Sequence, residues 1–247
     1  MNIYISLNHS TKVDAGDFGV WLAQVIASFQ GSVGTEVPCG NCRGCCTSSY
    51  FIHIRPDDRK TLEVVPKTLL STAPGLPQGH KLIGYASDGS CPLLQDRECS
   101  IYNHRPQTCR DYDCRVFAAA GIDAGGTDKT AINQRVLAWQ FSYATEQDLQ
   151  IHKAVKAAAF FIEKNRAAFP GGRAPVSPSD IAILAIKVHH AFLMAETKNM
   201  TLAEKAEAIV HASREFEATR ERLDHEKQPN PSFERDAAKA RRPSTLR

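Results

Sequence analysis

Apolar residues recur at helical spacing near the start of the chain. They lie three or four positions apart, at Phe18, Trp21, Leu22, Val25, Ile26 and Phe29. This is the period of a helix that buries one stripe of side chains. The pattern predicts a helix over residues 14–30.

The helical period returns in the second half of the chain. It runs from about Thr130 to Phe169, with a break where Thr145 and Asp148 can form a capping box. The spacing therefore predicts that a new helix begins just after Thr145.

Two further helices are expected towards the end of the chain. Ser179 can cap a helix through residues 180–199, and Thr201 with Glu204 can form a capping box before a helix that ends near residue 225. Residues 226–247 lack an apolar stripe, which predicts a disordered tail.

Between these helical segments, regular patterns are short. The stretch "SYFIHI" predicts a short strand, and "PDDRKTLEVV" predicts a short helix that Pro66 ends or bends. Apolar pieces near residues 83–85, 92–94 and 100–102 predict a small hairpin-like sheet. The expected fold class is therefore α+β, an irregular cysteine-rich module with short strands followed by a mainly α-helical C-terminal half.

This change of pattern along the chain suggests a division into parts. We expect a cysteine-cluster metal-binding module with its N-terminal helix at residues 1–120, a helical region at 121–225 and the tail at 226–247.

Composition narrows the function only slightly. The 247 residues are 43% hydrophobic and 23% charged with a net charge of +3, so neither nucleic acid nor a membrane is called for as a partner. The first residues lack the pattern of a signal peptide, and no stretch reaches the ~18 apolar residues of a membrane span. A cytoplasmic location is expected, with an unidentified protein or redox partner.

The cysteines carry the clearest chemical signal. All eight lie in one part of the chain, at Cys39, Cys42, Cys45, Cys46, Cys91, Cys99, Cys109 and Cys114. Disulfides are rare in a reducing cytosol, and adjacent Cys45 and Cys46 cannot readily bridge each other. Crowded thiols in that setting usually bind metal, so all eight are candidate metal ligands.

The spacing of the first four cysteines suits a loop wrapped around a metal. In C-x2-C-x2-C-C, the two-residue gaps let successive sulfur atoms converge. Gly40 and Gly44 are expected to supply positive φ angles in this loop.

The sequence leaves the metal open between an iron–sulfur cluster and zinc. Cys39, Cys42 and Cys45 have the spacing of a ferredoxin-type cluster loop, and Cys91 is followed by Pro92, as the last cysteine of such a loop is. Zinc sites with four thiolates use the same two-residue gaps.

Local geometry suggests which cysteines do not share a metal. If residues 91–94 and 99–102 form a hairpin closed by residues 95–98, Leu94 lies opposite Cys99, and strand alternation would turn Cys91 and Cys99 to opposite faces. Cys109 and Cys114 would lie about 140° apart on one helix, so either that helix is broken or only one of them is a ligand.

The sequence signals for other kinds of chemistry are weaker. Overlapping C-x2-C pairs also occur in thiol redox enzymes, but the further cysteines fit a ligand cage better. His53 and His104 are more typical of structural histidines than of ligands, and "GIDAGGTDKT" lacks the spacing of a phosphate-binding loop. No catalytic constellation is recognised beyond the cysteines.

The strings "CGNCRGCC" and "CPLLQDRECSIYNHRPQTCRDYDC" together closely resemble the YkgJ-like cysteine-cluster family. The resemblance covers residues 39–114 and implies a zinc- or iron-chelating domain with all eight cysteines as ligands. It also implies supporting roles for Tyr102, Arg105, Pro106, Arg110 and Tyr112.

Two functions are therefore expected from the sequence. The first is a metal-binding protein with a cysteine-ligated iron–sulfur cluster or zinc, serving a redox or modification step. The alternative is a structural zinc module that supports a helical protein-interaction surface without catalysis.

Overall fold

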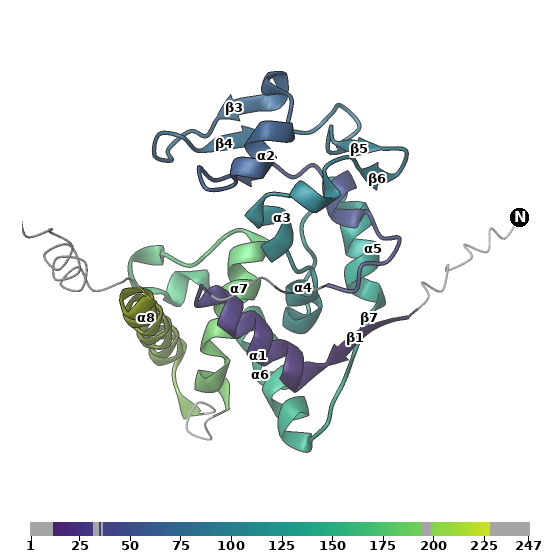
Figure 1. The fold of residues 1–247 in the computed structure, drawn as a ribbon. Coiled ribbons are helices and arrows are strands. Elements are labelled where there is room, and N and C mark those ends of the chain that lie inside the picture. Colours follow the sequence, from purple (N-terminus) through teal and green to yellow (C-terminus); the bar gives the residue numbers. More distant parts are fainter. Residues whose placement is uncertain (1–11, 32–34, 36, 194–198, 228–247) are drawn as a thin grey trace, which may run out of the picture.

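The computed structural model describes residues 12–31, 35, 37–193 and 199–227 (Figure 1). The fold class is α+β, as predicted, with short strands in the first half of the chain and helices in the second. Residues 226 and 227 of the predicted disordered tail belong to a helix, and residues 228–247 lie outside the described residues. Within the described residues, none of the helices has the length and apolar character needed to cross a bilayer.

The elements follow one another in short segments. The α-helices are α1 (Phe18–Phe29), α2 (Arg59–Val64), α3 (Gln107–Asp111), α4 (Arg115–Ala120), α5 (Thr130–Ala138), α6 (Glu146–Lys164), α7 (Pro178–Val188) and α8 (Leu202–Lys227). The strands are β1 (Val13–Asp17), β2 (Ile52–Ile54), β3 (Leu70–Thr72), β4 (Lys81–Ile83), β5 (Leu94–Gln95), β6 (Glu98–Cys99) and β7 (Trp139–Ser142). Short 3-10 helices include η1 (Gly44–Thr47) and η3 (Tyr102–His104).

The larger hydrophobic core lies among α1 and α4 to α8. We call this part, residues 12–31, 114–193 and 199–227, the helical lobe; it occupies the lower half of Figure 1. Its core includes Phe18 and Trp21 of α1, Phe117 of α4 and Ile162 of α6, all fully or almost fully buried. Cys114 belongs to this core.

A smaller core lies in the upper half of Figure 1, in residues 52–104, which we call the sheet lobe. Its antiparallel sheet has the strand order β2-β4-β3, with Ile52 opposite Ile83 and Leu70 also opposite Ile83. The hairpin β5–β6 lies beside it. The buried residues of this core are Ile54, Val65, Ile83, Cys91, Leu93 and Ile101.

The first helix begins later than predicted. Residues 13–17 form β1, which pairs in parallel with β7, and α1 starts at Phe18. The Asp17 carboxylate accepts the backbone N–H of Val20 and so caps α1. The partner strand comes from residues 139–142, inside the segment predicted to be helical, and local periodicity cannot reveal such a distant pairing.

The predicted caps are largely confirmed. Thr145 and Asp148 form a full capping box at α6, and the Thr201 and Glu204 side chains bond each other's backbone N–H groups before α8. The cap of α7 is Ser177, not Ser179, because Pro178 takes the first helical position, where its missing N–H costs nothing.

Candidate metal centre

The loop that carries the first four cysteines, residues 37–49, is folded by its own backbone. We call it the cysteine loop. The N–H of Cys42 donates to the carbonyl of Cys39 at 2.9 Å, and the N–H of Cys46 donates to the carbonyl of Arg43 at 2.9 Å. The Arg43 guanidinium donates to the carbonyls of Gly40 and Cys42. These bonds turn the backbone tightly between successive cysteines.

The two glycines of the loop serve different purposes. Gly40 has φ +53°, as predicted for a residue in the left-handed region. Gly44 is instead required by packing, since a Cβ there would lie 3.1 Å from Ile132 Cα and 3.2 Å from the carbonyl oxygen of Ala131. The loop therefore packs directly on the backbone of α5.

Two cations from the helical lobe anchor the ends of this loop. The Arg135 guanidinium of α5 donates to the carbonyls of Pro38 and Cys39. The Lys129 ammonium donates to the carbonyl of Ser48 at 2.5 Å and lies over the ring of Tyr50. Sequence reasoning missed both residues, because nothing local links them to the cysteines.

Cys39, Cys42 and Cys114 lie in one neighbourhood. The indole N–H of Trp139 donates to Cys114 Sγ at 3.2 Å, and the Arg135 that binds the Cys39 carbonyl lies 4.4 Å from the Trp139 ring centroid. Burial, with smaller effects from the charges of Asp113, Cys39 and Cys42, raises the pKa of Cys114 to about 12. These three thiols are therefore electrostatic neighbours.

Cys46, Cys91, Cys99 and Cys109 lie in a second neighbourhood. The first three pack in or against the core of the sheet lobe, and the N–H of Cys91 donates to the carbonyl of Cys46 at 2.7 Å. Burial raises the pKa of Cys109 to about 12, with the charges of the other three thiols acting in the same direction.

The structure corrects one inference about this neighbourhood. The predicted register is confirmed, with Leu94 opposite Cys99. However, Cys91 and Cys99 do not face apart: both contact the same core, and the charge of Cys99 raises the pKa of Cys91 after burial. Strand alternation does not reach Cys91, because a turn closed by Leu94 N–H to Cys91 C=O separates it from the two-residue strand β5.

The helix containing Cys109 and Cys114 is broken, which is one of the two outcomes expected from their spacing. α3 ends at Asp111 and α4 begins at Arg115. The break turns Cys109 towards the sheet lobe and Cys114 into the core of the helical lobe.

Adjacent Cys45 and Cys46 connect the two neighbourhoods. Their sulfur atoms are 3.9 Å apart. The hydrogen bond between them lowers the pKa of Cys46 to about 7, an effect that Arg43 and Arg105 reinforce. The same hydrogen bond raises the pKa of Cys45. Cys46 is therefore the more acidic member of the pair.

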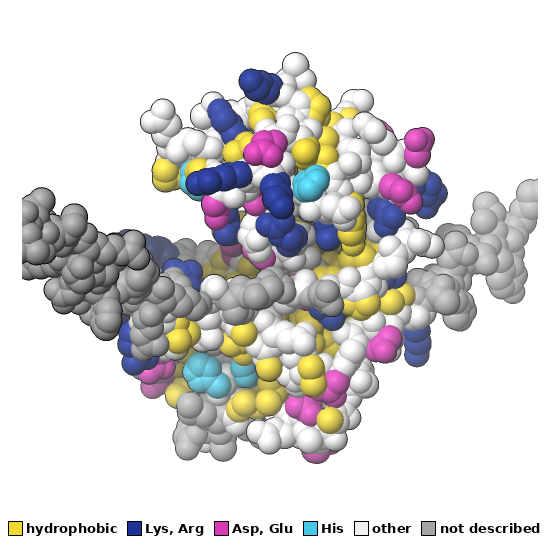
Figure 2. All heavy atoms as spheres, in the orientation of Figure 1, with side chains coloured by type: hydrophobic (Ala, Val, Ile, Leu, Met, Phe, Trp, Pro, Cys, Tyr) yellow, Lys and Arg dark blue, Asp and Glu magenta, His cyan; other side chains and the backbone are white. Residues whose placement is uncertain are grey.

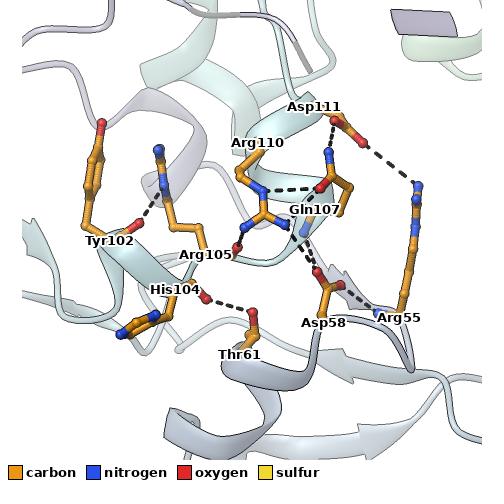
Figure 3. A network of polar contacts seen from close by, with 9 residues as sticks. All are labelled: Arg55, Asp58, Thr61, Tyr102, His104, Arg105, Gln107, Arg110 and Asp111. Atoms are coloured by element: carbon orange, nitrogen blue, oxygen red, sulfur yellow. Dashed lines mark hydrogen bonds and ion pairs between the residues drawn. The ribbon is translucent and has the colours of Figure 1, made fainter. Parts of the chain in front are cut away.

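Asp58 fixes the position of α3 and hence of Cys109 (Figure 3). Its carboxylate, whose side chain is 3% exposed, accepts the backbone N–H groups of Arg55 and Gln107 at 2.9 and 2.8 Å. The Arg110 guanidinium lies 3.6 Å from the same carboxylate. Sequence reasoning did not identify Asp58, although Asp before a helix is a common cap.

The resemblance to the cysteine-cluster family implied supporting roles for several residues. These residues make different contacts in the structure. Arg105 lies 3.7 Å from the ring centroid of Tyr102 and favours the Cys46 thiolate (Figure 3). Arg110 binds Asp58 and Gln107 instead of a thiol. The Tyr112 hydroxyl donates to the Tyr50 hydroxyl at 3.1 Å.

Lys and Arg side chains are frequent on the face of the sheet lobe shown in Figure 2.

A buried ion pair links the region of Cys114 to the first helix. Arg115 and Asp113 are 2.8 Å apart at their nearest atoms and almost fully buried. The Asp113 carboxylate also accepts the indole N–H of Trp21, and the Arg115 guanidinium donates to the carbonyl of Ala15. This network holds the residues on both sides of Cys114 against α1 and β1.

The candidate histidines have other partners. His53 stacks on His80, with Nε2 and Nδ1 2.7 Å apart. The backbone carbonyl of His104 accepts the Thr61 hydroxyl. No contact in the described residues connects either imidazole to a thiol.

All eight cysteines are free thiols. Among the described residues, no group of three or more Cys, His, Asp or Glu side chains is arranged to hold a metal ion as it stands. The donor chemistry fits zinc or iron, but binding requires the thiols to rotate towards one another from these positions.

A protein-family model matches the segment of the chain that carries the eight cysteines. Residues 38–135 match the family model CxxCxxCC, described as "Putative zinc- or iron-chelating domain". Because of its similarity to that model, we call this part of the chain the CxxCxxCC domain. It contains the eight cysteines and ends within α5, so it includes Arg135 but not Trp139. The match supports metal binding by the CxxCxxCC domain, with zinc or iron as the metal. No curated protein and no solved structure gives a significant match to the chain.

Proposed function

We propose that the CxxCxxCC domain binds iron as a cysteine-ligated iron–sulfur cluster and serves a redox step. The observation that carries this proposal is the indole N–H of Trp139, which donates to Cys114 Sγ at 3.2 Å inside a hydrophobic core. Hydrogen bonds to sulfur and burial are two of the factors that set the reduction potential of such clusters.

Other hydrogen-bond donors and positively charged side chains also stabilise thiolates of the CxxCxxCC domain. The backbone N–H of Gly44 donates to Cys42 Sγ at 3.4 Å, and Arg43 and Arg105 favour the thiolate of Cys46. These groups stabilise negative charge on the sulfur atoms, which increases when a cluster is reduced. Cys45 is exposed at the surface, where a redox partner could approach.

Metal analysis of protein purified without oxygen tests this proposal. We expect iron and acid-labile sulfide in matched amounts, with absorption near roughly 400 nm that bleaches on reduction. Zinc without sulfide, in protein from iron-replete cells, would contradict it. The matched control is a variant with all eight cysteines changed to Ser, which should contain neither metal.

A structural zinc module is the second candidate, and the size of the sheet-lobe core favours it. That core has six buried residues, and one of them is Cys91. So small a core gains little from packing alone, whereas a zinc ion bound by four thiolates contributes folding energy directly. Zinc in the metal analysis, together with unfolding of the sheet lobe by a chelator, would support this function.

A further inference from the structure

We infer that the eight cysteines form two separate four-thiolate sites, divided between the adjacent residues Cys45 and Cys46. Site A consists of Cys39, Cys42, Cys45 and Cys114, and site B of Cys46, Cys91, Cys99 and Cys109. The inference rests on the metal ligation proposed above, but not on which metal is bound.

Site A is built against the helical lobe. Cys114 lies in the larger core, where Trp139 donates to its sulfur. Arg135, which contacts the Trp139 ring, binds the carbonyl of Cys39. The N–H of Cys42 donates to that same carbonyl, so the backbones of Cys39 and Cys42 and the sulfur of Cys114 are all linked to one Arg–Trp pair.

Site B is built into the sheet lobe. Cys91 is buried in the smaller core, against which Cys46 and Cys99 pack, and the backbones of Cys46 and Cys91 are joined by a hydrogen bond of 2.7 Å. Cys109 reaches them from α3, which packs on β2 and is held by Asp58.

Cys45 lies next to the division between site A and site B. Cys45 lies in η1, which packs on α5 of the helical lobe, and Cys114 belongs to the core of that same lobe. Cys46 rather than Cys45 packs against the core of the sheet lobe, which places Cys46 in site B. Four thiolates complete the coordination of one zinc ion or one cubane cluster.

The division has a structural consequence. One metal would join the cysteine loop to the helical lobe, and the other would join the same loop to the sheet lobe. The single peptide bond between Cys45 and Cys46 would then connect two metal sites.

Titration with Co²⁺ under anaerobic conditions tests the grouping. We expect wild-type protein to retain two ions per chain with thiolate-to-cobalt absorption. Cys91→Ala and Cys114→Ala should each retain one ion. The double variant within site B, C91A/C99A, should also retain one ion, whereas the cross-site double variant C91A/C114A should retain none.

The possible results of this titration distinguish a failure of the two-site grouping from a failure of the proposed function. A single variant that loses both ions, or a within-site double variant that loses more than the single variant, would overturn the two-site grouping while leaving metal ligation intact. Wild-type protein that binds no Co²⁺ would overturn the proposed function itself.

A measurement on unmodified protein covers the case in which variants fail to fold. The wild-type chain loaded with ¹¹³Cd²⁺ should give two resonances without cadmium–cadmium coupling. Coupling between the two signals would show a bridging thiolate and a single shared cluster, which would overturn the inference.

Discussion

At the scale of single residues, the thiols are distinguished by neighbours that lie far away in the chain. Trp139 and Arg135 come from α5 and its end, yet they contact Cys114 and Cys39. Trp139 lies beyond the last residue matched by the family model. The surroundings of Cys114 and Cys39 therefore depend on residues outside the cysteine motif.

Replacing Trp139 by Phe should weaken metal binding. The ring is retained, but the N–H bond to Cys114 Sγ is lost. Loss of such an outer partner typically lowers metal affinity by roughly 10-fold. Competition with a chelator, monitored by metal release, measures the change.

The control for this variant is Phe161→Leu, which removes a buried aromatic contact between Phe161 of α6 and Phe169 and leaves the Trp139 hydrogen bond in place. It should lower the free energy of unfolding without changing metal affinity. Equal metal affinity in the Trp139→Phe variant and the wild type would show that the hydrogen bond has no role in binding.

At the scale of elements, α3 depends on one carboxylate. Changing Asp58 to Ala leaves two backbone N–H groups without their acceptor and removes the partner of Arg110. We expect a loss of about 2–3 kcal/mol in the free energy of unfolding, measured with urea.

Asp111→Ala is the matched control, because Asp111 is an exposed residue of the same network, 3.9 Å from Arg55. It should cost less than about 1 kcal/mol. Similar losses in the two variants would mean that the buried carboxylate does not position α3.

The contact between α1 and α6 should make stability depend on pH. His152 of α6 stacks on Phe18 of α1 at 4.4 Å and hydrogen-bonds the Tyr143 hydroxyl. Burial, with a smaller effect of Lys156, lowers the pKa of His152 to about 4. The folded protein therefore keeps this imidazole neutral at pH values where the unfolded chain protonates it.

Stability should consequently fall as the pH drops from about 6.5 to about 4, by up to a few kcal/mol from this residue. Urea unfolding at several pH values measures it. In the His152→Phe variant the slope over this range should be shallower, and an unchanged slope would exclude His152 as its source.

At the scale of the whole molecule, the two lobes should respond differently to loss of metal. The helical lobe has a large core built from six helices, whereas the sheet-lobe core is small and contains Cys91. Removing metal from holoprotein with a chelator should raise hydrogen exchange in β2, β3 and β4 and leave α6 and α7 protected.

Hydrogen–deuterium exchange resolved by mass spectrometry can follow both lobes in one experiment. Unchanged protection in the three strands after complete metal removal would show that packing alone holds the sheet lobe. The all-Ser cysteine variant provides the reference for a chain that cannot bind metal.

Local patterns in the sequence predicted the features that depend on neighbouring residues. The helix stripe of α1, the capping boxes of α6 and α8, and the pairing of Leu94 with Cys99 all follow from contacts within a few positions. Spacing and residue type alone also indicated a metal-binding module, because thiol chemistry does not depend on the fold around it.

Only the tertiary structure decided features that join distant segments. The pairing of β1 with β7, the packing of Gly44 on α5, and the neighbours of each thiol all bring together residues far apart in the sequence. Such contacts form when the chain closes long loops around a shared core, and no local pattern encodes which segments meet. For this reason the sequence by itself determined that cysteines gather here, whereas the fold decided which of them are neighbours.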